Sequence, residues 1–151
     1  MLVNEQTLVL REIDKDNFYA ICQLSVKIEQ QNHVDSNAIS MAEASFSNHA
    51  WMKGIYLNET PVGFAMVEVC AEPNKFYLWR FMIDKNYQGL GLGRGAIELI
   101  VDELKTVFNA SKLTTSVVPS ETGPQKFYEN VGFELTGKYV DDRELELKRL
   151  F

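Results

Sequence analysis

Apolar and polar side chains follow two different repeats along this chain, and the repeat changes from segment to segment. Short runs that alternate between apolar and polar positions, or stay apolar for a few residues, are typical of β-strands. Residues 58–61 (NETP) and 72–74 (EPN) provide turn-forming side chains between neighbouring runs, which predicts hairpins there. The predicted strands are residues 7–11, 52–57, 62–71, 76–84, 113–118, 133–139 and 144–150.

Four other segments carry the repeat of three to four residues that marks an amphipathic helix. The first begins near Asp16, a good helix cap, and continues to about residue 28. The second begins with a capping-box pattern, Ser-x-x-Glu, at residues 40–43. The third covers residues 96–108, and the fourth begins at Pro124, a residue favoured at helix starts.

The predicted elements follow one another in the order β-α-α-β-β-β-α-β-α-β-β. Hairpins give antiparallel strand pairs, whereas a strand–helix–strand crossover gives a parallel pair, so the sheet is expected to be mixed and mostly antiparallel. We therefore predict an α/β (α+β) fold in which about seven strands are flanked by four helices. The chain has 151 residues and no internal repeat or linker-like stretch, which predicts a single domain over residues 1–151.

The charge of the chain narrows the range of partners. It carries 21 acidic and 15 basic residues, a formal net charge of −6. This balance disfavours nucleic acid, because nucleic-acid recognition normally needs a basic patch. The acidic excess would suit a cationic substrate, although ordinary solubility is the simpler explanation of the same charge.

The chain shows no signal for secretion or membrane insertion. The first residues, MLVNEQTLVLREID, lack the basic-then-apolar order of a signal peptide, and no apolar run approaches the ~20 residues that cross a bilayer. Cys22 and Cys70 have no metal-ligand spacing and are expected to be free thiols in a reducing compartment. We therefore expect a cytoplasmic protein that binds neither a metal nor a membrane.

The segment QGLGLGRG, residues 88–95, places four glycines between a predicted strand and a predicted helix. A helix N-terminus presents unpaired N–H groups and the positive end of the helix dipole, and glycine lets the backbone come close to a phosphate. Arg94 opposes the dipole unless an anion is bound beside it. The segment therefore predicts an anion site, with a flexible turn and a solvated Arg94 as the alternative.

Two known phosphate loops fit this segment poorly. The Walker A pattern requires Gly-Lys-Ser/Thr, which does not follow. Gly91-x-Gly93-x-x-Ala96 matches the dinucleotide fingerprint in its letters, but that fingerprint follows the first strand of a βαβαβ unit rather than a series of hairpins. A dinucleotide-binding module with affinity for NAD stays as a weaker alternative.

A third pattern covers nearly the whole chain. Residues 83–93, Ile-Asp-x-x-Tyr-Gln-Gly-x-Gly-x-Gly, resemble the acetyl-coenzyme A signature of the GNAT superfamily of N-acetyltransferases, Gln/Arg-x-x-Gly-x-Gly/Ala. Residues 127–133 (FYENVGF) are similar to the second signature of that family, Tyr-x-x-x-Gly-Phe. Residues 34–44, 79–84 and 118–124 resemble a bacterial branch of the family, the spermine/spermidine (diamine) acetyltransferases. The resemblance implies the GNAT fold and acetyl-CoA as co-substrate.

The resemblance also implies how the coenzyme is held. The glycines would surround its pyrophosphate, and the backbone of residues 82–83 would pair with its pantetheine arm where the strand separates from its neighbour at a bulge. Ser120 stands where many relatives have an asparagine that touches the coenzyme, so this contact is left open. The implied coenzyme-binding residues are Met82, Ile83, Gln88, Gly89, Gly91, Leu92, Gly93, Arg94 and Phe127.

Tyr128 is the residue to which the resemblance assigns the role of general acid. An unperturbed tyrosine has a pKa of ~10, so it is protonated at neutral pH and can donate to a leaving thiolate. The helical spacing of Phe127, Tyr128 and Val131 alone would instead place Tyr128 in the core. The general base is not identified, because Trp79 stands near the position of the glutamate that many relatives use. Glu68 could act through water or could simply face solvent.

The resemblance places the acceptor against the first two helices and the loop between them. Acidic side chains there would attract a cationic amine, although solvated loop residues and a helix cap explain the same pattern. Glu43 is either part of that acidic wall or the capping partner of Ser40. His33 and His49 are isolated and are expected to have surface or capping roles. The candidate acceptor-binding residues are Glu29, Asp35, Asn37, Glu68 and Trp79.

These features predict an acetyl-CoA-dependent N-acetyltransferase that acts on a small primary amine such as a polyamine. One alternative keeps the fold but acetylates an amine of a peptide or protein. Another is a coenzyme A-binding sensor without turnover, against which the presence of Tyr128 argues. No nucleic-acid partner is expected, and the oligomeric state is left open between a monomer and a homodimer.

Overall fold

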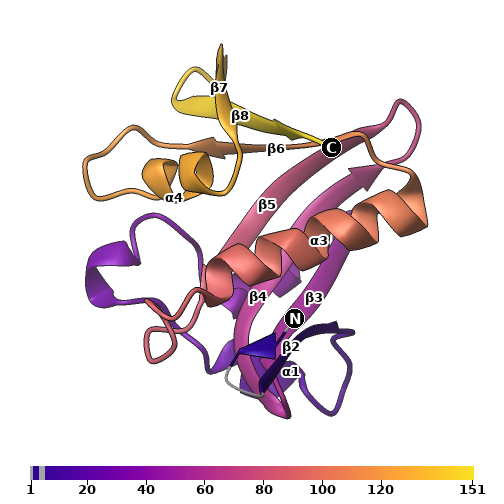
Figure 1. The fold of residues 1–151 in the computed structure, drawn as a ribbon, viewed down its shortest axis with the longest axis vertical. Helices are drawn as coiled ribbons and strands as arrows, with labels where there is room; N and C mark the ends of the chain where they lie inside the picture. Colours follow the sequence, from indigo (N-terminus) through magenta and orange to yellow (C-terminus); the bar gives the residue numbers. More distant parts are fainter. Residues whose placement is uncertain (1, 4–5) are drawn as a thin grey trace.

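The protein folds into a mixed sheet with helices on both faces, shown here by a computed structural model that describes residues 2–3 and 6–151 (Figure 1). The sheet has eight strands in the order β1-β2-β3-β4-β5-β6-β8-β7, and β5 and β6 are its parallel pair. The strands are β1 (Leu2–Val3), β2 (Gln6–Arg11), β3 (Ala50–Leu57), β4 (Thr60–Cys70), β5 (Lys75–Ile83), β6 (Lys112–Val117), β7 (Glu134–Val140) and β8 (Glu144–Leu150). The helices are α1 (Phe18–Cys22), the 3-10 helix η1 (Ile28–Gln30), α2 (Asn37–Ala44), α3 (Leu92–Phe108) and α4 (Gln125–Asn130).

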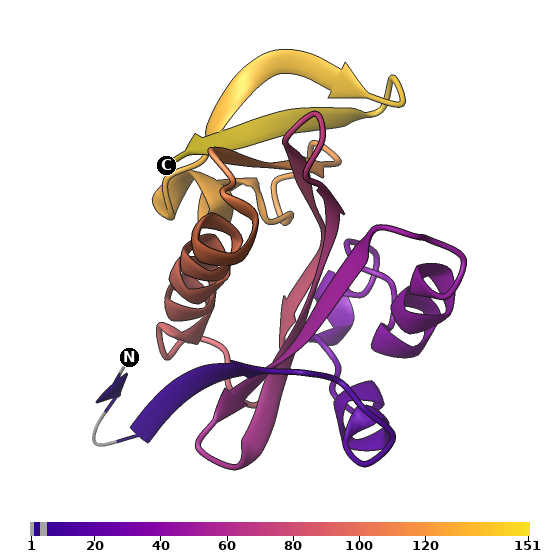
Figure 2. The ribbon, with the colours of Figure 1, turned by 90° about the vertical axis from the view of Figure 1, so that its right-hand side faces the viewer.

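The predicted α/β fold is confirmed, and the sheet separates two apolar cores. α3 and α4 cover one face, while α1 and α2 cover the other (Figure 2). The larger core lies under α3 and contains Ile97, Ile100 and Leu104, which are fully buried at the helical spacing seen in the sequence. The smaller core includes Ile21 of α1 and Phe64 of β4. Seven strands match the predicted ones to within two residues at each end, and β1 is additional.

The chain between β2 and β3 departs from the prediction. α1 ends at Cys22, so the predicted continuation of the helix to about residue 28 is wrong. Beyond α1 the backbone bonds to the end of β5 instead. The Ser25 N–H donates to the Asp84 carboxylate at 2.9 Å, and the Ser25 carbonyl accepts from the Lys85 N–H at 2.8 Å. These bonds satisfy the polar backbone groups that a longer helix would have paired internally.

The second helix begins earlier than predicted. The Ser36 hydroxyl caps α2 by accepting from the Ile39 N–H at 3.2 Å. Ser40 is fully buried within the helix and donates to the Ser36 carbonyl at 3.0 Å. The predicted capping box at residues 40–43 is therefore wrong, because Ser40 faces the core and Glu43 bonds to Arg80 of β5.

β5 and β6 separate along their length, which opens the sheet. Their parallel pairing is registered at Tyr77 and Thr114, near the start of β5. The β4–β5 register shifts between Met66 and Val67, and Trp79 is the extra residue, as in a β-bulge. The bulge and the separation that the family resemblance implied are therefore present, and they leave the edge of β5 beyond Trp79 available to a ligand.

Candidate active site

A cleft of about 1190 Å³ lies where β5 and β6 separate. Its walls come from β5, the glycine loop, α4, the loop between α1 and α2, and the β7–β8 hairpin. Typical sites for small ligands measure ~300–1,000 Å³, so this cleft is large enough for an extended ligand or for two ligands together. A cavity of about 350 Å³ adjoins it and shares Val34, Asp35 and Met82 with its wall.

The glycine loop forms part of the cleft wall. Gly89 and Gly91 have φ angles of 78° and 80°, the left-handed conformation that glycine adopts without strain, and a Cβ at either would meet nothing within 4 Å. Gly91 is also the N-cap of α3, so the first N–H groups of that helix open toward the loop. A Cβ on Gly93 would stand 3.0 Å from the Phe127 ring, so this glycine permits close contact between α3 and α4.

Polar side chains hold the loop in place. The Gln88 amide donates to the Ile83 carbonyl at 2.9 Å and to Gln30 Oε1 at 2.8 Å, and Gln30 donates back at 3.1 Å. Arg94 is exposed, but one of its guanidinium nitrogens donates to the Asn130 carbonyl at 2.9 Å. The loop is thus tied to β5, to η1 and to α4. The whole predicted set of coenzyme-binding residues lines the cleft: Met82, Ile83, Gln88, Gly89, Gly91, Leu92, Gly93, Arg94 and Phe127.

Tyr128 belongs both to the core and to the cleft wall. Its side chain is 7% exposed, and its ring makes edge contacts with Phe127 and Phe133 at centroid distances of 5.3 and 5.4 Å. Burial raises the pKa of its phenol well above the ordinary value, and the nearby Thr115 hydroxyl offsets a small part of that rise. The phenol therefore keeps its proton at neutral pH and is available as a proton donor.

The predicted acidic wall on the α1–α2 side is largely neutralised. Arg80 of β5 pairs with Asp35 at 2.7 Å and with Glu43 at 2.9 Å. Asn37 is buried and donates to the Ile21 carbonyl at 2.9 Å, and it lines the smaller cavity instead of the cleft. Of these candidates, Asp35 therefore reaches the cleft, but as the partner of an arginine.

The remaining acceptor candidates divide in the same way. Glu29 lies in η1 and is exposed, and it is not among the residues that line either cavity in the described chain. Glu68 and Trp79 both line the cleft. Trp79 packs against the core under α1, and Glu68 stands opposite Tyr77 in the β4–β5 register.

Sequence reasoning missed the carboxylates that the C-terminal hairpin brings to the cleft. Glu144 and Glu146 of β8 line it together with Asp141. The Ser116 hydroxyl donates to Glu144 at 3.2 Å and lies 2.5 Å from the Tyr77 hydroxyl. Glu144 and Glu146 are two residues apart on a strand and therefore share one face, a spacing that is visible in the sequence and could have marked them as a pair. Only the pairing of β8 with β6 shows which way that face points.

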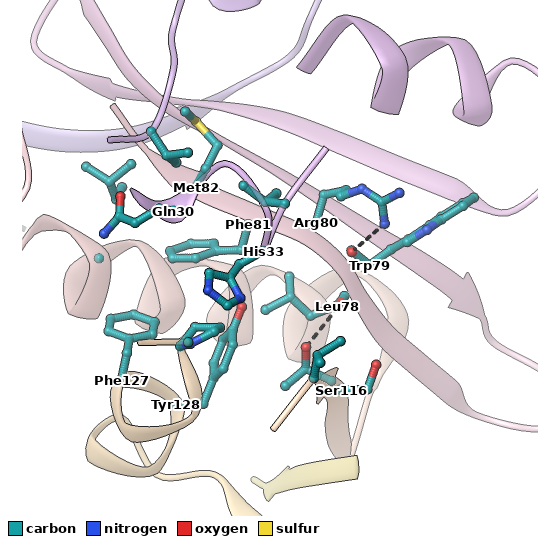
Figure 3. Close-up of a pocket in the computed structure, with 18 of the residues that line it drawn as sticks. Gln30, His33, Leu78, Trp79, Arg80, Phe81, Met82, Ser116, Phe127 and Tyr128 are labelled. Carbon is teal, nitrogen blue, oxygen red and sulfur yellow. Dashed lines mark hydrogen bonds between the residues drawn. The ribbon is translucent and has the colours of Figure 1, made fainter. Parts of the chain in front are cut away.

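His33 is a second residue whose position the sequence did not reveal. It lies in the loop between η1 and α2, and its ring projects into the same cleft as Tyr128 (Figure 3). His33 Nε2 lies 3.4 Å from the Thr122 hydroxyl, and a Cβ on Gly123 would stand 3.6 Å from His33 Nδ1. The loop thus crosses the cleft and touches the segment that leads into α4. The expected surface or capping role of His33 does not describe this placement.

Within residues 2–3 and 6–151, no three His, Cys, Asp or Glu side chains gather as metal ligands. Cys22 and Cys70 are free thiols. No helix in the described part of the chain is both long and apolar enough to span a bilayer.

Comparison with known proteins identifies related sequences. The profile of the Acetyltransferase (GNAT) family matches residues 9–133. A curated relative, the probable spermine N(1)-acetyltransferase of Bacillus subtilis subsp. natto, is 26% identical over 135 residues, which cover 85% of this chain and 89% of the relative.

Solved structures show the same fold. Spermidine N-acetyltransferase from Vibrio cholerae, in complex with CoA and spermine, aligns with a TM-score of 0.74 at 17% identity over 95% of each chain. An acetyl transferase from Salmonella typhimurium that modifies the N-terminal serine of ribosomal protein L7/L12 aligns with a TM-score of 0.78 at 16% identity, covering 96% of this chain and 95% of that one. The fold is thus shared by proteins with different acceptors.

Proposed function

This chain belongs to the GNAT acetyltransferase family and is an N-acetyltransferase, and from that premise we propose that it moves the acetyl group of acetyl-CoA to a primary amine of a small cationic molecule such as a polyamine. The observation that carries the proposal is that the glycine loop and the buried phenol of Tyr128 face one cleft. An anion site would hold the pyrophosphate of the coenzyme, and a proton donor in the same cleft would serve its departing sulfur.

The described residues fit the coenzyme at two places. The glycine loop presents the first N–H groups of α3 without side chains in the way, which suits a pyrophosphate. The edge of β5 at Ile83 offers a backbone N–H that can pair with an amide of an extended arm, as an added strand would. The Ile83 carbonyl already accepts from the Gln88 amide at 2.9 Å, and the neighbouring Met82 is paired with Phe64 of β4. When bound there, acetyl-CoA supplies an acetyl thioester to the centre of the cleft.

Acetyl transfer then makes three demands on this chain. The amine must lose a proton before it attacks, since alkyl ammonium groups resemble lysine with a pKa of ~10.4. A backbone N–H of β5 would donate to the carbonyl oxygen as it gains negative charge. The Tyr128 hydroxyl would donate its proton to the departing sulfur. Burial keeps the phenol protonated until the sulfur leaves, and the same burial opposes formation of the phenolate, so the proton must be replaced as the amide forms.

Two observations support a cationic acceptor. The curated relative at 26% identity is named as a probable spermine acetyltransferase. In addition, Glu68, Asp141, Glu144 and Glu146 line the cleft, whereas Asp35 is already paired with Arg80. We therefore assign the attraction of the cationic end of the substrate to the β4 and β7–β8 side of the cleft rather than to the α1–α2 side.

The proposal is tested by measuring release of free coenzyme A thiol with a panel of acceptors. The panel contains spermine, spermidine, an aminoglycoside, an amino acid and a peptide with a free N-terminus. We expect the highest kcat/KM with the polyamines. A higher kcat/KM with the peptide would reassign the protein to the peptide-amine class. Acetyl-CoA binding without turnover of any acceptor would make it a coenzyme A sensor.

A further inference from the structure

The proposed reaction lacks one participant, a group that accepts the proton of the acceptor ammonium. We propose that His33 is this general base, an inference that rests on the acetyl transfer proposed above. The Tyr128 hydroxyl must reach the leaving sulfur, and the amine attacks the carbon bonded to that sulfur. The amine therefore lies near Tyr128, in the cleft into which His33 also projects (Figure 3).

The loop geometry leaves one nitrogen of the imidazole available. The His33 backbone N–H donates to the Gln30 carbonyl at 2.9 Å, which fixes the turn after η1. When Nε2–H donates to the Thr122 hydroxyl, 3.4 Å away, the lone pair of Nδ1 is free to accept a proton. Nδ1 lies beside Gly123, where a Cβ would stand 3.6 Å away, and both residues line the cleft, so no side chain at position 123 covers this nitrogen.

The other proton acceptors in the cleft are less suitable. Asp35 is held by Arg80 at 2.7 Å, and Glu144 accepts from Ser116 at 3.2 Å. A neutral imidazole has a lone pair on one ring nitrogen and can accept a proton without giving up an ion pair.

The proton and electron balance is complete. The ammonium gives one proton to His33, and its nitrogen lone pair forms the new C–N bond to the acetyl carbon. The C–S bond breaks, and the sulfur takes the proton of Tyr128. The second proton that leaves the nitrogen returns to Tyr128, and His33 releases its proton to solvent. The net result is one amide, one thiol and one proton.

Other ionisable groups share the cleft with His33 and enter any pH profile. They come from every element that forms the wall, and Glu43 joins them through its pair with Arg80. They are Asp35 of the α1–α2 loop, Glu68 of β4, Tyr77 and Arg80 of β5, Tyr87 and Arg94 of the glycine loop and α3, Tyr128 of α4, and Asp141, Arg143, Glu144 and Glu146 of the C-terminal hairpin.

The test compares His33→Gln with two other variants. His49→Gln removes the second of the two histidines, an exposed residue outside the residues that line the cleft, and serves as the matched control. Thr122→Val keeps the imidazole but removes its contact across the cleft. With spermidine as acceptor, we expect His33→Gln to lower kcat at neutral pH by ~10²-fold or more. We also expect its rate to keep rising with pH, because the amine must then deprotonate unaided.

A binding measurement gives a readout that does not depend on turnover. The chain has two histidines, so their Cε1–H proton signals can be assigned from the two glutamine variants. Spermine added to the complex with free coenzyme A should change the chemical shift and the titration curve of His33 and leave those of His49 unchanged. The calorimetric Kd for acetyl-CoA should be the same in His33→Gln as in the wild type.

Each contrary outcome has one meaning. A His33→Gln enzyme with the wild-type rate and pH profile would overturn the inference while the proposed function stands. An equal loss of rate in Thr122→Val would make His33 a closing contact rather than a base, which also overturns the inference. A wild-type protein that transfers acetyl to no acceptor would overturn the proposed function itself.

Discussion

Replacing Tyr128 by phenylalanine removes one oxygen atom from the cleft and leaves the packing of α4 in place. The ring lies against Phe127 and Phe133 at centroid distances of 5.3 and 5.4 Å, and phenylalanine keeps both contacts. The substitution therefore separates the two roles that the sequence leaves open for this residue, proton donor and core side chain. We expect Tyr128→Phe to lose catalysis and to keep its fold.

The two roles predict effects of different size. Loss of general acid catalysis typically costs ~10²–10⁴-fold in rate, which is about 2.7–5.4 kcal/mol at ~1.36 kcal/mol per tenfold. The hydroxyl contributes to stability no more than the typical net value of one hydrogen bond, about 0.5–1.5 kcal/mol. For a chain of 151 residues this corresponds to a Tm shift of about 2–4 °C. Tyr128→Ala would instead leave a cavity that costs about 3–5 kcal/mol.

The assay measures three quantities on the same preparation: the single-turnover rate, the calorimetric Kd for acetyl-CoA and the Tm. For Tyr128→Phe we expect kcat and kcat/KM to fall together, with the Kd unchanged and the Tm close to that of the wild type. Tyr128→Ala shows how large the stability loss is when the ring itself is removed. Undiminished single-turnover chemistry in Tyr128→Phe would refute the assignment of the proton donor.

Three further predictions concern the loop, the charges and the arginine of the cleft. Gly91→Val should weaken acetyl-CoA binding strongly, because φ is 80° at this position and a β-branched residue would force the loop out of its conformation. Gly137→Val is the control: its φ is 85° on β7, so it should cost similar stability but leave the calorimetric Kd for acetyl-CoA unchanged. With spermidine, kcat/KM should fall as salt rises, since exposed charges are screened over ~8–10 Å at physiological ionic strength, and Glu144→Gln should flatten that slope; a flat wild-type profile would contradict the cationic acceptor. Arg80→Met should lower the Tm by a few degrees, because Asp35 and Glu43 both lose their ion-pair partner, and each pair contributes up to about 1 kcal/mol to the free energy of unfolding. An unchanged Tm would show that these ion pairs do not stabilise the fold.

Much of the fold could be read from the sequence because its determinants are local. Alternation with a period of two places side chains on one face of a strand, and a period of 3.6 places them on one face of a helix. The strand bounds and the position of α3 follow from these repeats alone, and they are confirmed to within two residues for the seven predicted strands. The glycine loop is equally local, since the need for left-handed φ angles at Gly89 and Gly91 selects the residue type directly.

The segment before β3 could not be read in this way. The helical repeat from residue 18 onward is real, but α1 stops at Cys22 because Ser25 bonds to residues at the end of β5. Likewise, the Ser-x-x-Glu pattern at residue 40 indicates a cap. In the structure Ser40 is buried inside the helix and Glu43 pairs with Arg80, so the helix begins at Asn37 instead. In both places a partner distant in sequence decided between local alternatives of similar free energy.

The chemistry of the site divides in the same way. The sequence by itself determined the glycine loop and the place of Tyr128 in its signature, because each is a short pattern whose residue types are required by its own backbone or chemistry. Only the tertiary structure decided that Arg80 neutralises Asp35, that β8 carries Glu144 into the cleft, and that His33 projects into the cleft that holds Tyr128. Charge pairing and proton transfer depend on distances of a few ångströms between segments far apart in the chain. The pairing of the strands and the path of the α1–α2 loop across the cleft set those distances.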